Sequence, residues 1–190
     1  MELLISATAI ILLGGLVKGL TGFGYALIST SLLTIFMSAQ QAVAVMIIQL
    51  IAGNLELILE TDKKELKDCV KNFSGYILSL AAGTTLGMLM ISVIPSRTLQ
   101  VTVGLIAVLY TTSKISYIEQ EIGKIKEICF KTWEPVIGTA SGIIYGASNI
   151  GVPIITYLKS RELSRQKFTG TLAAIILILS LYRMILAQAT

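Results

Sequence analysis

Long apolar runs alternate with short charged segments along the chain, and these runs set the expected fold. The apolar runs cover residues 3–37, 41–59, 73–94, 99–113, 135–158 and 168–187. A helix crosses the bilayer core with about 20 apolar residues and satisfies its own backbone hydrogen bonds there. The pattern therefore predicts an all-α polytopic membrane protein, with single spans at 41–59, 73–94, 99–113 and 168–187.

Two of the runs differ from simple spans because glycines and polar residues interrupt them. Block 3–37 is too long for one simple span and is broken near Gly19–Gly24, while block 135–158 carries Asn149 among its glycines. Closely spaced glycines weaken a helix. A broken backbone survives at membrane depth only where protein or a water-filled cavity covers it. Each block is therefore predicted to hold a break that faces the protein interior.

Composition agrees with a membrane protein. Of the 190 residues, 54% are hydrophobic and 14% are charged, against about 25% charged in soluble domains. The net charge of +4 comes from basic residues gathered in three short segments, 60–72, 114–131 and 159–167. Such segments mark the cytoplasmic side of a membrane protein, so they do not indicate a nucleic-acid partner. The expected location is the cytoplasmic membrane, crossed several times.

The three basic segments also predict how the chain is threaded. If all three are cytoplasmic, the spans 73–94 and 99–113 cross outward and back around Pro95. Block 135–158 then begins and ends inside, which makes it a re-entrant pair of half-helices. Block 3–37 begins and ends outside, either as a re-entrant pair or as two short spans.

The two interrupted blocks resemble each other, which predicts an internal repeat. Lys18-Gly19 aligns with Ser141-Gly142, and in both blocks small and polar residues are followed by an apolar run. Three single spans separate the blocks, so the two units face opposite ways, as in inverted-topology repeats of secondary transporters. The expected units are a first repeat 1–115, a cytoplasmic connecting loop 116–132 and a second repeat 133–190. The second is incomplete, since one span follows its broken block and three follow the first.

Lys18 is the first candidate for a functional side chain, because a cation inside an apolar block is costly and marks a functional site by default. The alternative is that Lys18 extends to the membrane interface. Next to it, Thr21, Gly22 and Gly24 offer a hydroxyl and backbone N–H groups at the start of a half-helix, which favours anions. The alternative there is close helix packing by small residues.

In the second block, Ser148 and Asn149 precede Pro153, a pattern typical of the capped start of a helix. The segment therefore predicts a second half-helix whose donors point into the protein, or a capped kink without a ligand. Tyr145 is expected in the core. Gln49 and Asn54 are expected to face the cavity, whereas Ser141, Gly142, Gly146 and the pair Gly83 and Gly87 indicate helix packing. The predicted substrate-binding set is Lys18, Thr21, Gly22, Gly24, Gln49, Ser148, Asn149 and Gly151.

Enzymatic chemistry has no support in the sequence. The chain contains no histidine, no P-loop and no GxSxG motif. Cys69 and Cys129 lie far apart in charged segments without zinc spacing, so reduced cytoplasmic thiols are expected. We therefore expect no catalytic residues, no metal and no cofactor, and the energy for uphill transport must come from a gradient or a partner chain.

Two segments carry a family resemblance. KGLTGFGYALIS and SGIIYGASNIGVPIITYL, at this spacing, look like the two signature segments of the TauE/SafE family of sulfite and organosulfonate exporters. ETDKKELKDCVKN followed by GTTLGM, and SRELSRQKF, resemble the family's other segments. The resemblance implies a membrane transporter for sulfur-containing anions such as sulfite or related small organic anions.

The chain departs from that family's pattern in two places. Ser31 stands where the family often has proline, and family members usually continue for about two further helices past the position of Thr190. The resemblance therefore leaves open a truncated product, a short variant or half of an assembly, completed by a second copy or a partner chain.

Together these features predict a permease that moves a small anion by alternating access. The alternatives are a permease for another small solute and a non-transporting membrane subunit. In the transporter, Thr21–Gly24 should approach Gly146–Asn149 near the membrane midplane, because each break needs cover from lipid.

Overall fold

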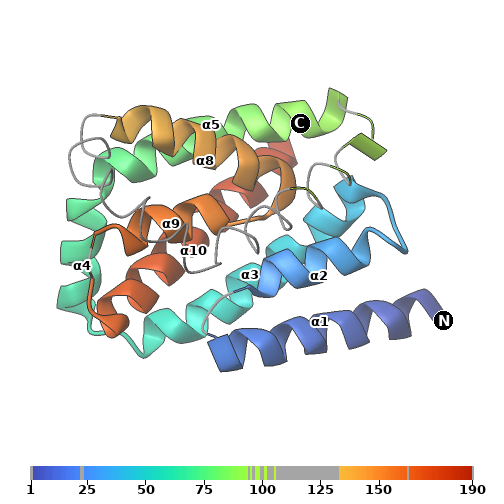
Figure 1. The fold of residues 1–190 in the computed structure, drawn as a ribbon, viewed down its shortest axis with the longest axis horizontal. Coiled ribbons are helices and arrows are strands. Elements are labelled where there is room, and N and C mark those ends of the chain that lie inside the picture. The colour runs from blue at the N-terminus through green and yellow to red at the C-terminus, as the bar shows by residue number, and fades with distance from the viewer. Residues whose placement is uncertain are drawn as a thin grey trace, which may run out of the picture.

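A computed structural model describes residues 2–21, 24–93, 95, 97–98, 101, 105, 133–161 and 163–189. In this part of the chain the regular structure is entirely α-helical (Figure 1). The helices are α1 (Glu2–Thr21), α2 (Tyr25–Leu33), α3 (Ala39–Leu59), α4 (Lys63–Asn72), α5 (Ser74–Val93), α8 (Glu134–Ser148), α9 (Val152–Lys159) and α10 (Arg165–Ala189). The expected span 99–113, the connecting loop 116–132 and Cys129 lie outside the described residues, apart from single positions.

Among the described helices, α3 and α10 are long and apolar enough to cross a membrane. Their bounds confirm the predicted spans 41–59 and 168–187 to within three residues. A third candidate is α5 combined with the end of α4, a pair bent by 70°. The apolar part of α1, Ile5–Leu20, is shorter than a full span.

The charged segment 60–72 is helical for most of its length, because α4 covers Lys63–Asn72. The reason lies in its apolar spacing. Cys69 and Phe73 are both buried, while Lys64, Lys67 and Lys71 are exposed, so the segment forms an amphipathic helix. The N–H of Lys64 donates to Asp62 Oδ1 over 2.7 Å and so helps to start the helix.

The first interrupted block forms a helical hairpin. Helix α2 runs back along α1, so that Gly14 of α1 lies against Tyr25 and Ser29 of α2. The hydroxyl of Ser29 donates to the carbonyl of Ile10 over 3.5 Å. The start of α1 and the end of α2 consequently lie at the same end of the molecule, at the right in Figure 1.

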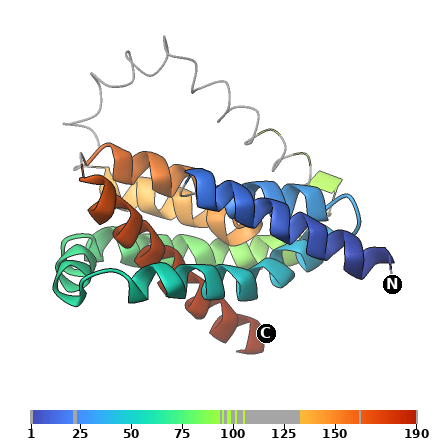
Figure 2. The ribbon, with the colours of Figure 1, turned by 90° about the horizontal axis from the view of Figure 1, so that it is seen from below.

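The second interrupted block forms another hairpin. Helix α9 reverses the direction of α8, and Arg161, just after α9, pairs with Glu134 at the start of α8 over 2.9 Å. These ends lie beside α4, at the left in Figure 1. The two hairpins therefore enter the described part of the molecule from opposite ends, and Figure 2 shows the same arrangement from below.

Glycines join the second hairpin to α5. The two helices pack in parallel with their backbones in contact, so a Cβ added to any of these glycines would collide with backbone atoms of the facing helix or with side chains on it. They are Gly83 and Gly87 on α5 and Gly138, Gly142 and Gly146 on α8. The predicted packing role of Gly142, Gly146 and the Gly83–Gly87 pair is confirmed.

Candidate functional site

Each hairpin turns at a residue in the left-handed backbone region. Among the described residues, positive φ occurs at Gly24, with φ 93°, and at Asn149, with φ 61°. Glycine adopts this region at little cost, and asparagine tolerates it better than most other residues. Both breaks therefore contain a residue in the left-handed region, Gly24 just before α2 and Asn149 just after α8.

The first break lies between the end of α1 at Thr21 and the start of α2 at Tyr25. Gly24 stands at the N-cap position of α2 and offers no side-chain hydrogen bond to the helix start. Gly22 and the side chain of Thr21, both predicted site members, lie outside what the structure describes. The break between the two helices therefore lies within the predicted interval Gly19–Gly24.

The second break differs from the predicted one in its capping. Ser148 and Asn149 were expected to cap the start of the second half-helix, and this is wrong: Ser148 is the last residue of α8, and Asn149 is its C-cap. The hydroxyl of Ser148 donates to Ile144 O over 2.6 Å and accepts from Ile150 N over 3.2 Å. Asparagine suits this position because helices commonly end on a left-handed residue.

The N-cap of α9 is Gly151, again without a side-chain hydrogen bond. Pro153 lies in the first turn, as predicted, where its missing N–H costs nothing. Both half-helices that follow a break therefore have a glycine at the N-cap position. Their first N–H groups have no partner within the helix and no capping side chain from that position.

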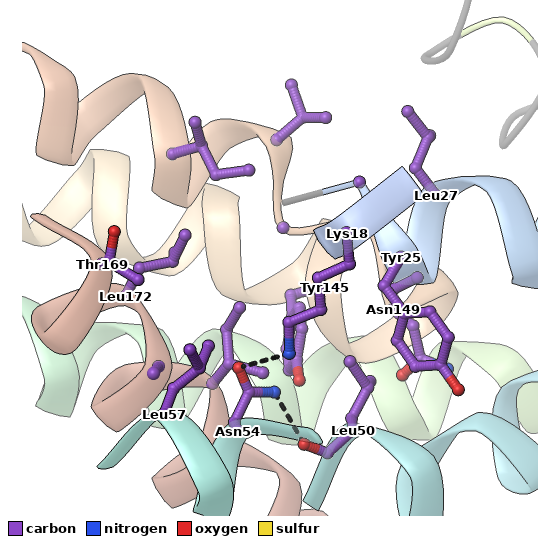
Figure 3. A pocket seen from close by; sticks show the side chains of 17 residues that line it. Lys18, Tyr25, Leu27, Leu50, Asn54, Leu57, Tyr145, Asn149, Thr169 and Leu172 are labelled. Atoms are coloured by element: carbon purple, nitrogen blue, oxygen red, sulfur yellow. Dashed lines mark hydrogen bonds between the residues drawn. The ribbon is translucent and has the colours of Figure 1, made fainter. Parts of the chain in front are cut away.

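The two breaks line one small cavity (Figure 3). Its volume is about 50 Å³, enough for several water-sized groups. The first break contributes Lys18, Gly24 and Tyr25, and the second contributes Tyr145, Asn149, Gly151 and Val152. Helices α3 and α10 form the walls. The wall residues are Leu50, Asn54 and Leu57 of α3, and Thr169, Leu172, Ala173 and Ile176 of α10. The structure therefore brings Lys18, Gly24, Asn149 and Gly151 of the predicted set together.

Lys18 points inward from the last turn of α1 (Figure 3). Its Nζ donates to the carbonyl of Gly53 over 2.7 Å and to Asn54 Oδ1 over 3.4 Å. The amide of Asn54 is itself fixed, since its Nδ2 donates to Leu50 O over 2.6 Å. The ammonium group is therefore held against α3.

Gln49 does not line this cavity. It lies in a wider groove of about 1170 Å³ between α1 and α3, together with Gly19 and Glu56. Its Oε1 is buried without a hydrogen-bond partner. Lys18 lines both spaces, so it stands where the groove and the cavity meet.

Sequence reasoning missed Arg183. This residue of α10 is 1% exposed, and its Nη1 donates to Asn149 Oδ1. Its guanidinium carbon lies 5.4 Å from the ring centroid of Tyr145, whose hydroxyl pairs with Ser180 Oγ over 3.0 Å. Arg183 stands near the end of the last apolar run, where a basic residue is ordinary. The signal that was available is that a charge within an apolar helix is functional by default.

Asn149 is held from two sides. Its Oδ1 accepts from Arg183 of α10, and its Nδ2 donates to the carbonyl of Val43 in α3 over 2.9 Å. Both ends of the amide are therefore engaged within the protein. The side chain therefore fixes the second break between the candidate spans α3 and α10. Its role at the cavity is to hold the break in place.

The comparison with protein families gives one match, to the family described as Sulfite exporter TauE/SafE, over residues 7–190. This confirms the resemblance carried by the two broken segments. Neither the curated proteins nor the solved structures contain a match to the chain.

Proposed function

Because the chain belongs to the TauE/SafE sulfite exporter family, whose members are membrane transporters and not enzymes, we propose that it moves a small sulfur-containing anion across the cytoplasmic membrane through the cavity between its two breaks. Sulfite, a sulfonate or a related organic anion fits the size of the cavity. The observation that carries the proposal is that Lys18 and two uncapped half-helix starts line the same cavity.

Three positive features converge on this cavity. Lys18 supplies an ammonium group, and a hydrogen bond between charged groups contributes about 1.5–3 kcal/mol. The starts of α2 and α9 carry the positive ends of their helix dipoles. Because Gly24 and Gly151 leave those starts uncapped, an anion can accept hydrogen bonds from their N–H groups without displacing a side chain.

The opposite entry of the two hairpins supports an inverted repeat and alternating access. Hairpin α1–α2 begins and ends at one end of the described molecule, and α8–α9 at the other (Figure 1). Transporters with inverted repeats open their midplane site by moving one unit against the other. In this proposal the hairpins part at one end at a time, with the anion held between the breaks.

The basic segments support the proposed orientation. Helix α4 and the end of α9 lie at the same end of the molecule (Figure 1). Helix α4 carries four lysines, α9 ends at Lys159, and Arg161 follows it. We assign that end to the cytoplasm, because basic residues are enriched in cytoplasmic loops.

Flux through proteoliposomes tests this function. The purified chain alone should give saturable uptake of labelled sulfite or methanesulfonate, and unlabelled anion should compete with it. Dimethyl sulfone, an uncharged solute of similar shape, should compete poorly. Uptake of the neutral solute in preference to the anion, or no uptake by correctly folded protein, would contradict the proposal.

A further inference from the structure

Arg183 is a buried cation that the transport proposal above does not use. Its side chain is 1% exposed, and among the described residues it forms no ion pair. Its Nε is buried and has no hydrogen-bond partner in the part of the chain that the structure describes. Burial of a charge is costly unless the charge is paired, so an unpaired guanidinium in an apolar helix calls for a counter-charge from elsewhere.

The neighbours of Arg183 connect it to the cavity. Asn149 accepts its hydrogen bond and Tyr145 places its ring against the guanidinium, and both residues line the cavity. Arg183 itself is not among the lining residues. It therefore lies one side chain behind the cavity wall.

We propose that Arg183 is a specificity-determining residue: its fixed positive charge behind Tyr145 and Asn149 selects anions, and doubly charged anions over singly charged ones, without touching the solute. This inference rests on the transport function proposed above. Inside a protein, where the effective dielectric constant is about 20, charges several Å apart change an affinity by about tenfold or more. The transported anion then serves as the missing counter-charge.

The two cations near the cavity are not equivalent. Lys18 is half-buried, is held by two oxygen atoms of α3, and shares its groove with Glu56. Arg183 donates to the neutral amide of Asn149 and has no carboxylate beside it among the described residues. The field of Arg183 is therefore less compensated. It reaches the cavity through the apolar surroundings of α10, in which water does not screen it.

A purely structural role is the competing explanation, in which Arg183 only holds Asn149 in place. The two roles differ in how transport depends on solute charge. We would measure competition against labelled methanesulfonate by three solutes of similar shape: dimethyl sulfone, methanesulfonate and sulfate, with charges of 0, −1 and −2. If Arg183 only holds Asn149 in place, its loss should affect all three solutes alike. If its electric field selects anions, its loss should change the order in which the three solutes compete.

The variants are Arg183→Lys, which keeps the charge, and Arg183→Gln, which keeps hydrogen-bond donors without it. Wild type and Arg183→Lys should prefer sulfate to methanesulfonate and methanesulfonate to dimethyl sulfone. In Arg183→Gln, KM for methanesulfonate should rise about tenfold or more, and the advantage of sulfate should disappear. An unchanged charge series in folded Arg183→Gln overturns the inference.

Asn149→Asp gives an independent test if Arg183→Gln does not fold. It replaces the amide that accepts from Arg183 by a carboxylate of the same shape, so the guanidinium gains an internal partner. This variant should also lose the preference for anions, and retention of the charge series would overturn the inference. If wild type itself shows no preference for anions, the proposed transport function fails, whatever the variants do.

Discussion

Both breaks contain a residue in the left-handed backbone region, but they differ in how firmly the rest of the protein holds them. Gly24 has no side chain, and a Cβ there would meet only Val17 at 3.9 Å. Asn149 is fully buried and is tied to α3 and α10 through both ends of its amide. The first break is therefore held by its own hairpin and by Lys18, and the second by the core.

This difference indicates that the two hairpins have different roles when the cavity changes shape. A hinge needs residues that change their backbone angles without losing buried contacts. The first break meets that condition, whereas movement at the second would break the hydrogen bonds of Asn149 to Arg183 and to the carbonyl of Val43. We infer that the second hairpin is the fixed half of the cavity and the first is the half that adapts.

The largest expected effect comes from breaking the second turn. Asn149→Leu removes both amide hydrogen bonds, leaves Arg183 unpaired and places a branched side chain in the left-handed region. The expected cost is about 3–5 kcal/mol of unfolding free energy. Thermal unfolding in detergent, followed by size-exclusion chromatography, measures it.

Gly24→Ala is the matched change in the first break. The added methyl group makes an ordinary contact with Val17, so the expected cost is that of the left-handed backbone, about 1–2 kcal/mol. A larger loss of stability in Gly24→Ala than in Asn149→Leu would reverse the assignment of fixed and adaptable halves.

The glycine contact that anchors the second hairpin gives the next effect. Gly142→Ala adds a methyl group against the backbone of α5 near Leu80 and Thr84, and should cost about 1–3 kcal/mol. Gly15→Ala in α1 is the control, because nothing lies within 4 Å of its Cβ. It should leave the melting temperature unchanged or raise it, as alanine favours helix over glycine by about 1 kcal/mol. Equal losses in the two variants would contradict the packing account.

Lys18→Gln tests the cationic side of the first hairpin. It removes a charge-assisted hydrogen bond of about 1.5–3 kcal/mol to a bound anion, so anion affinity should fall about tenfold or more. Binding of methanesulfonate to purified protein measures the change, and the melting temperature without anion serves as the control for folding. Unchanged affinity would show that Lys18 does not bind the anion and serves only to join α1 to Gly53 and Asn54 of α3.

The smallest effect is expected at the ends of the second hairpin. Glu134→Gln breaks the pair with Arg161, in which both side chains keep about a quarter of their surface exposed, 22% and 28%. Solvent screens such a pair, and the cost should stay below about 1 kcal/mol. A cost as large as that of Gly142→Ala would mean that the pair, and not the glycine contact, closes this hairpin.

The sequence could predict the features that depend on composition alone. Apolar length predicted α3 and α10, and clustered glycines with polar neighbours predicted both broken blocks. The details of the second break were wrong because Ser148 and Asn149 suit the start and the end of a helix equally well. The two possibilities differ in which residue caps α9, and the structure has Gly151 at that N-cap position.

Arg183 and Gln49 show what sequence reasoning lacked. Arg183 lies 34 residues after Asn149, and only the packing of α10 against α3, α5 and α9 brings the two side chains together. Gln49 and Asn54 both lie on α3, but the rotation of that helix turns Asn54 to the cavity and Gln49 to the wider groove. Tertiary packing decides both outcomes, and neither has a local pattern.

Solute protection at both breaks tests most directly the claim that they share one anion cavity. Ala26→Cys and Val152→Cys place thiols on its two sides, in a background in which Cys69 and Cys129 are replaced by serine. We predict that methanesulfonate slows alkylation of both thiols, with the same half-protecting concentration, while dimethyl sulfone protects neither. Protection at one break only, or at two clearly different concentrations, would contradict the account.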